Sequence, residues 1–221
     1  MNTPQAIIFD LNGTMIDDMQ FHLEEWYNVI VNHLGANLTL QQVKAQMYGS
    51  NFELFERVFG KGRYTPEEIE AIAMMKERQY QERFRPHLRL IEGLPLFLDR
   101  IARNQVKLGI ASAAPPFNID FVLDALDIRK QFGAVVSAAD VKKSKPDPEP
   151  FLKAAQQLGV APEHCLVFED APKGIEAALR AGMKAVAITT IHTAAEFSQY
   201  PDVLFFIKDY TDPRLSTLIP E

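Results

Sequence analysis

Short apolar runs alternate with helix-length segments through most of this chain, and this alternation limits the folds open to it. The runs are strand-like and fall at residues 6–9, 106–111, 134–137, 165–168, 185–188 and, more weakly, 203–207. The segments between them have helical periodicity and include 94–102, 117–126, 147–158 and 173–181. Strands separated by helices of this length indicate βαβ units and a parallel sheet covered on both faces. Because such crossovers are right-handed, we predict an α/β fold with a doubly wound, Rossmann-like sheet.

The stretch between the first and second apolar runs has a different pattern. Apolar side chains recur at three- and four-residue spacing from Met19 to Leu34, and capping boxes begin at Thr39 and Thr65. We therefore predict a small, all-helical cap domain at residues 17–86, inserted after the first strand. Residues 1–16 and 87–221 then form the α/β core domain.

Composition argues against several classes of function. The 29 acidic residues outnumber the 23 basic ones, and the net charge is −6, so we expect no nucleic-acid partner. The apolar runs are too short to span a bilayer, and no secretory signal pattern opens the chain. The one cysteine, Cys165, lies in an apolar run and fits a core position. We expect a cytoplasmic protein without a membrane partner.

Polar residues stand where several of the predicted strands end, which is where open α/β sheets bind ligands. They are Asp10, Ser112, Lys145, Glu169 and Asp170. Taken alone, Ser112 fits a helix cap equally well, and Lys145 fits a solvated loop lysine better. Together they indicate a site, because neighbouring carboxylates repel unless a cation neutralises them, and oxygen ligands suit Mg²⁺. Serine and lysine can hold phosphate oxygens, and a carboxylate can attack phosphorus.

Four segments, in order and with matching spacing, resemble the four motifs of the haloacid dehalogenase superfamily. They are Phe9–Thr14, Ile110–Ser112, Lys145–Pro148, and Phe168–Asp170 followed by Gly174–Ala178. The helical insert is similar to the small cap of the β-phosphoglucomutase-like branch. The resemblance implies a Mg²⁺-dependent phosphatase that acts on a small phosphorylated metabolite, a sugar phosphate, through an aspartyl-phosphate. The implied site residues are Asp10 as nucleophile, Ser112, Ala113 and Lys145 as phosphate ligands, and Asp10, Glu169, Asp170 and the Asn12 carbonyl as Mg²⁺ ligands.

Asn12 departs from the family pattern, in which phosphatases and mutases carry a second aspartate as general acid and base. An amide keeps the shape and the backbone carbonyl but cannot carry a proton at neutral pH, and losing such help costs about 10²–10⁴ in rate. Three explanations stay open. The chain is a slow enzyme with another proton carrier, for which His22 is the candidate, or a phosphate-ligand binding protein without turnover, or a substituted form of an active enzyme. His22 also fits an ordinary position on the helix stripe with Trp26.

A β-phosphoglucomutase-like phosphohexomutase is the alternative enzyme. Such mutases have a basic residue after the second-motif serine and an arginine in the cap loop, whereas residues 113–116 and 49–53 contain no cation here. Lys76 can supply one charge, although a solvated helix lysine is the simpler interpretation. Asn118 fits either a bond to a substrate hydroxyl or a role at a helix start. Dehalogenation ranks low, because the acidic pair at 169–170 favours a metal that dehalogenases of this superfamily do not need. We expect a monomer or weak homodimer.

Overall fold

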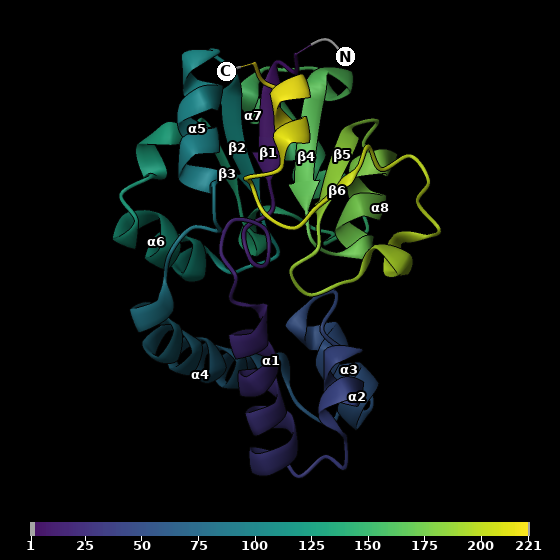
Figure 1. The fold of residues 1–221 in the computed structure, drawn as a ribbon. Helices are drawn as coiled ribbons and strands as arrows, with labels where there is room; N and C mark the ends of the chain where they lie inside the picture. Colours follow the sequence, from purple (N-terminus) through teal and green to yellow (C-terminus); the bar gives the residue numbers. More distant parts are fainter. Residues whose placement is uncertain (1–2, 221) are drawn as a thin grey trace. The chain divides into compact units, whose positions relative to one another are not determined.

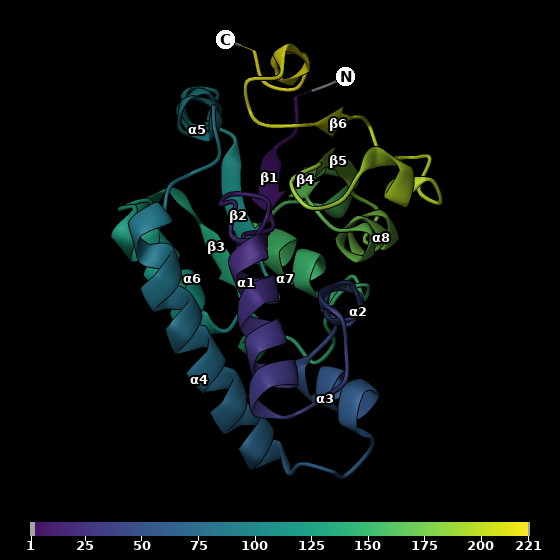
Figure 2. The ribbon, with the colours of Figure 1, turned by 60° about the horizontal axis from the view of Figure 1, so that its bottom comes forward.

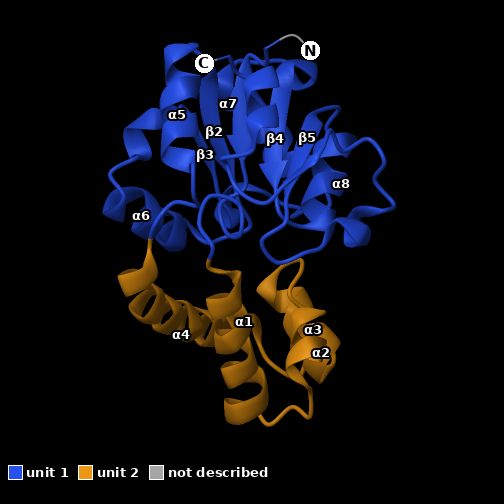
Figure 3. Ribbon diagram, in the orientation of Figure 1, with its two compact units in different colours: residues 1–17, 89–221 blue, residues 18–88 orange. Residues whose placement is uncertain are grey.

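The computed structural model describes residues 3–220 and divides the chain into two compact units (Figure 3). The core unit comprises Met1–Asp17 and Arg89–Glu221, and the cap unit comprises Asp18–Leu88. No helix among the described residues is long and apolar enough to cross a membrane.

The core unit is built on a six-stranded sheet in the order β3-β2-β1-β4-β5-β6, and every neighbouring pair is parallel (Figure 1). The strands are β1 Ala6–Phe9, β2 Lys107–Ala111, β3 Ala134–Val136, β4 Cys165–Glu169, β5 Lys184–Ile188 and β6 Phe206–Ile207. This confirms the predicted α/β class and doubly wound sheet. The last strand is shorter than predicted, because only Phe206 and Ile207 of residues 203–207 pair with β5.

Helices cover both faces of this sheet, as Figure 2 shows from another side. They are α5 Leu94–Arg103, α6 Pro116–Ala125, α7 Glu149–Leu158 and α8 Pro172–Arg180. Alternate strand residues point to opposite faces. On one face, Ile8 and Val167 pack in a cluster with side chains of α7 and α8. On the other, Phe9 and Phe168 stack against each other, and Phe168 packs against Phe97 of α5.

Strand β1 lies where the order of the strands along the sheet reverses. Strands β2 and β3 continue on one side of β1, and β4, β5 and β6 on the other. Ligand sites in open α/β sheets form at such a switch point, beyond the carboxyl ends of the strands. The backbone N–H of Asp10 donates to the carbonyl of Phe168 at 2.9 Å, so the chain is still paired where β1 ends. This arrangement positions the site described below.

The cap unit is helical and has its own apolar core around Trp26, Ile30 and Phe55. Its helices are α1 Met19–Tyr27, α2 Leu40–Lys44, α3 Asn51–Phe59 and α4 Pro66–Phe84. The capping boxes predicted at Thr39 and Thr65 are present. The first helix is less regular than predicted, since residues 28–33 continue α1 as a π-helical segment.

Candidate active site

Three carboxylates meet at the carboxyl ends of the two central strands. Asp10 follows β1, Glu169 is the last residue of β4, and Asp170 comes next. They lie close together because β1 and β4 pair in parallel with Phe9 opposite Phe168. One carboxylate oxygen of each lies within 4.8 Å of the other two, and all three residues are buried. An all-oxygen cluster of this kind suits a hard divalent cation.

Lys145 reaches into this cluster from the loop before α7. Its Nζ donates to Asp10 Oδ1 at 2.6 Å and to Glu169 Oε1 at 2.8 Å, and it lies 4.9 Å from the ring centre of Phe151. Burial by itself would lower the pKa of the ammonium, but the charges of Asp10 and Glu169 outweigh burial and raise the pKa above its ordinary value. Only 9% of the side chain is exposed, so the interpretation as a solvated loop lysine is wrong.

Glu169 is held at both carboxylate oxygens. Oε1 accepts from Lys145, and Oε2 accepts from the backbone N–H of Ala171 at 2.7 Å. The carboxylate lies directly over Gly174 of α8, where a Cβ atom would come 1.7 Å from Oε1. Because Gly174 has no side chain, the Glu169 carboxylate can occupy this space. The sequence placed Gly174 inside a motif without indicating this reason for it.

Ser112 and Asn118 lie at the carboxyl end of β2 and in the first turn of α6. The Ser112 N–H donates to the Val136 carbonyl at 2.9 Å, and its Oγ accepts from the Ala114 N–H at 3.1 Å. The N-cap residue of α6 is Pro115, without a side-chain cap. Neither Ser112 nor Asn118 is therefore the N-cap of α6, although Asn118 does lie at the start of this helix. Both residues are buried, whereas Ala113 between β2 and α6 is exposed.

Asn12 lies in a tight turn after Asp10. The Gly13 N–H donates to the Ile16 carbonyl at 2.8 Å, and Gly13 has a φ of +76°, a conformation that glycine adopts without strain. This turn, residues 11–16, is called the nucleophile loop below. Two hydroxyls that our sequence analysis did not identify bind it, and they come from Thr190 after β5 and Tyr210 after β6. The search for polar residues beyond the carboxyl ends of the strands, extended to the last two strands, would have found both.

The cap residues His22 and Lys76 form a buried pair. Lys76 Nζ lies 2.6 Å from His22 Nδ1 and 2.9 Å from Glu77 Oε1, and His22 Nε2 lies 3.3 Å from Asp18 Oδ2. When Lys76 is an ammonium group it only donates, so Nδ1 then accepts, and the other ring nitrogen, Nε2, faces Asp18. Lys76 is 1% exposed, so the interpretation as a solvated helix lysine is wrong. Burial lowers the Lys76 pKa, against the opposing charge of Glu77.

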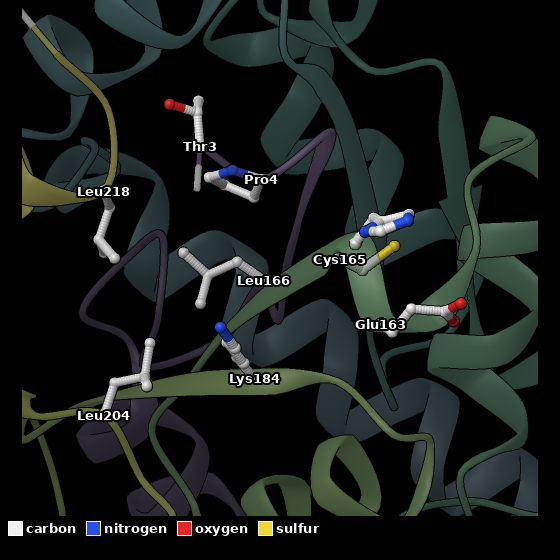
Figure 4. Close-up of a pocket in the computed structure, with 9 residues that line it drawn as sticks. Thr3, Pro4, Glu163, Cys165, Leu166, Lys184, Leu204 and Leu218 are labelled. Atoms are coloured by element: carbon white, nitrogen blue, oxygen red, sulfur yellow. The ribbon is translucent and has the colours of Figure 1, made fainter. Parts of the chain in front are cut away.

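A separate pocket of the core unit lies at the opposite, amino-terminal edge of the sheet (Figure 4). Its lining includes Cys165 and Leu166 at the start of β4 and Lys184 at the start of β5. Parallel α/β sheets bind ligands at the other edge. The carboxylate cluster, not this pocket, is the candidate active site.

Comparison with known proteins finds relatives that match most of this chain. Residues 7–188 match the family model described as haloacid dehalogenase-like hydrolase. The chain is 32% identical over 195 residues to a β-phosphoglucomutase from Bacillus subtilis, which covers 83% of each chain. It is 31% identical over 184 residues to a fructose-1-phosphate phosphatase from Escherichia coli, which covers 83% of this chain and 95% of that one.

A solved structure has the same fold. The β-phosphoglucomutase of Clostridium difficile matches with a TM-score of 0.84 at 25% identity, over 98% of this chain and 96% of that one. The family match spans β1 to β5 and includes all four motifs. The resemblance predicted from those motifs is confirmed, and the chain belongs to the haloacid dehalogenase-like hydrolase family.

Proposed function

We infer that this chain is a Mg²⁺-dependent phosphatase that hydrolyses a sugar monophosphate through a phosphorylated Asp10. The observation that carries the proposal is the position of Lys145, whose Nζ bridges Asp10 and Glu169 beside a third carboxylate. A cation next to a carboxylate nucleophile can hold the oxygens of a transferring phosphoryl group. The fructose-1-phosphate phosphatase among the relatives supports this class of substrate.

The residues present fit a magnesium ion. Asp10, Glu169 and Asp170 offer buried carboxylate oxygens within 4.8 Å of one another, and a bound cation lowers the repulsion between neighbouring carboxylates. Asp10, Asp170, the Asn12 carbonyl and Glu169 would hold the ion. When bound, it would neutralise the carboxylates and the charge of the phosphoryl oxygens.

The chain's own residues then account for the reaction in two steps. The Asp10 carboxylate attacks phosphorus, the bond from phosphorus to the sugar oxygen breaks, and the alkoxide that leaves takes up a proton. Ser112, the backbone at Ala113 and Lys145 bind the phosphoryl oxygens. Water next attacks the phosphorus of the aspartyl-phosphate and loses a proton, which releases inorganic phosphate and restores the carboxylate.

Both proton transfers lack their usual carrier at Asn12, which has no titratable side chain. His22 is a weak substitute, because both of its ring nitrogens face partners within the cap unit, Lys76 and Asp18. We therefore expect turnover about 10²–10⁴-fold below that of an enzyme with a positioned acid and base.

A phosphatase fits this chain better than a phosphohexomutase. A mutase has to hold a second phosphate, and neither residues 113–116 nor residues 49–53 contain a cationic side chain. Lys76 is buried between His22 and Glu77. Arg57 uses its guanidinium to bind the carbonyls of Gln46 and Tyr48, both at 2.7 Å.

Phosphate release from a panel of sugar phosphates with Mg²⁺ tests the proposal. The panel includes fructose 1-phosphate and β-glucose 1-phosphate, and the proteins are the chain with its present sequence, called the natural chain only to distinguish it from its variants, Asn12→Asp and, as a control, Asp10→Ala. We expect Asn12→Asp to release phosphate about 10²–10⁴-fold faster than the natural chain, and Asp10→Ala to be inactive.

The alternatives give different results. Glucose 6-phosphate formed from β-glucose 1-phosphate would identify a mutase. Tight binding of a sugar phosphate without hydrolysis, even by Asn12→Asp, would identify a binding protein and refute the phosphatase.

A further inference from the structure

The nucleophile loop is held from outside by two hydroxyl groups. Thr190 Oγ1 donates to the Gly13 carbonyl at 2.6 Å, and Tyr210 OH donates to the Thr14 carbonyl at 2.9 Å. Both carbonyls belong to buried residues. Buried backbone carbonyls need a donor, so these hydroxyls restrain the Gly13–Thr14 and Thr14–Met15 peptide planes.

The donors come from the carboxyl ends of the last two strands. Thr190 is two residues beyond β5, and Tyr210 is three residues beyond β6. The two strand ends are joined where the Thr189 N–H donates to the Ile207 carbonyl at 2.9 Å. The C-terminal part of the sheet thus reaches back to the loop that follows the first strand.

Tyr210 is itself held firmly. Its ring centre lies 5.5 Å from that of Phe168 and 5.7 Å from that of Phe97, and its N–H donates to the Glu92 carbonyl at 2.9 Å. The chain passes so close to Gly93 that a Cβ there would lie 2.5 Å from the Tyr210 carbonyl carbon. A donor fixed in this way can restrain the loop to which it is bonded.

We propose that Thr190 and Tyr210 are positioning residues for the cation site. By fixing the Gly13 and Thr14 carbonyls, their hydroxyls restrain the loop that carries the Asn12 carbonyl, one of the proposed Mg²⁺ ligands. This role rests on the proposed function. It requires no contact between either hydroxyl and the substrate or the metal.

Magnesium affinity, measured by calorimetry without substrate, tests this role. Thr190→Val and Tyr210→Phe keep the shape of each side chain and remove one hydroxyl. We expect each to weaken Mg²⁺ binding about tenfold, the lower end of the effect of groups that orient metal ligands. Thr190→Ser keeps the hydroxyl and should restore the affinity to within about twofold of the natural chain.

Two further variants are matched controls. Thr189→Val removes a neighbouring hydroxyl that contacts the Ile207 carbonyl at 3.2 Å, and Tyr200→Phe removes a phenol that bonds Glu176 at 2.8 Å. Neither contacts the nucleophile loop through these bonds, so both should bind Mg²⁺ as the natural chain does. A general loss of stability would instead weaken Mg²⁺ binding to the same extent in these two controls as in Thr190→Val and Tyr210→Phe.

The outcomes separate this role from the proposed function. Normal Mg²⁺ binding by the natural chain together with unchanged affinity in Thr190→Val and Tyr210→Phe would overturn the positioning role alone. Absence of Mg²⁺ binding by the natural chain would overturn both. A loss that Thr190→Ser does not restore would also contradict a role for the Thr190 hydroxyl.

Discussion

Replacing Gly174 by alanine should destabilise this protein. In an ordinary helix, by contrast, a change from glycine to alanine stabilises the helix by about 1 kcal/mol. Gly174 lies within α8, Pro172–Arg180. An added Cβ would come 1.7 Å from Glu169 Oε1 and 1.9 Å from its Cδ. The Glu169 carboxylate would have to leave its place over the helix.

The magnitude follows from the bonds that this carboxylate makes. Glu169 would lose the Lys145 ammonium at 2.8 Å and the Ala171 N–H at 2.7 Å. A hydrogen bond to a charged group contributes about 1.5–3 kcal/mol, so the two together contribute about 3–6 kcal/mol. Subtracting the helix gain of about 1 kcal/mol leaves a loss of about 2–5 kcal/mol in the free energy of unfolding.

Urea unfolding of a double-mutant cycle measures this effect. Gly174→Ala is made in the natural chain and in Glu169→Ala, where no carboxylate occupies the space. In that second background we expect Gly174→Ala to be neutral or stabilising by about 1 kcal/mol. Glu169→Gln is the matched control, because its side chain has the same size and should leave the collision in place.

Activity should fall as well. Without Glu169, Lys145 keeps only one of its two described carboxylate partners beside the nucleophile. A displaced catalytic group costs up to about 10²-fold in rate, which is measurable as phosphate release in an Asn12→Asp background. Stabilisation by Gly174→Ala in the natural chain, or an equal effect in both backgrounds, would refute the reasoning.

Two further predictions concern tyrosines whose phenols are hydrogen-bonded. Tyr80→Phe should lower the free energy of unfolding by about 1.5–3 kcal/mol in urea, because the phenol donates to the fully buried Asp18 at 2.5 Å; an unchanged midpoint would contradict it. Burial raises the pKa values of Tyr80 and Tyr210 above the ordinary 10, and that of Tyr200 to about 12. The protonated phenols therefore contribute fully to the free energy of unfolding below pH 10, and this contribution is lost as the pH rises further. Tyr80→Phe should make the fall of the free energy of unfolding above pH 10 shallower. Tyrosinate absorbance should show late ionisation of these phenols, and ionisation of all the tyrosines near pH 10 would contradict it.

The sequence alone predicted the order of elements, because strand and helix periodicity are local properties of neighbouring residues. Runs such as Ala6–Phe9 and Cys165–Glu169 and the capping box at Thr65 can be recognised without knowledge of the partner. The strand-end rule selected Asp10, Lys145 and the acidic pair at 169–170. The structure brings these four residues together.

Tertiary structure decided which strands are neighbours and which charges are buried. Lys145 meets Asp10 across 135 positions in the chain, and Lys76 meets His22 across 54. Both lysines fit solvated positions when judged by local sequence, because the environment of an ionisable group depends on partners that only folding supplies. The same holds for Gly174, whose neighbour is the Glu169 carboxylate, and for the hydroxyls on the nucleophile loop. Local pattern determines elements, whereas long-range packing determines contacts.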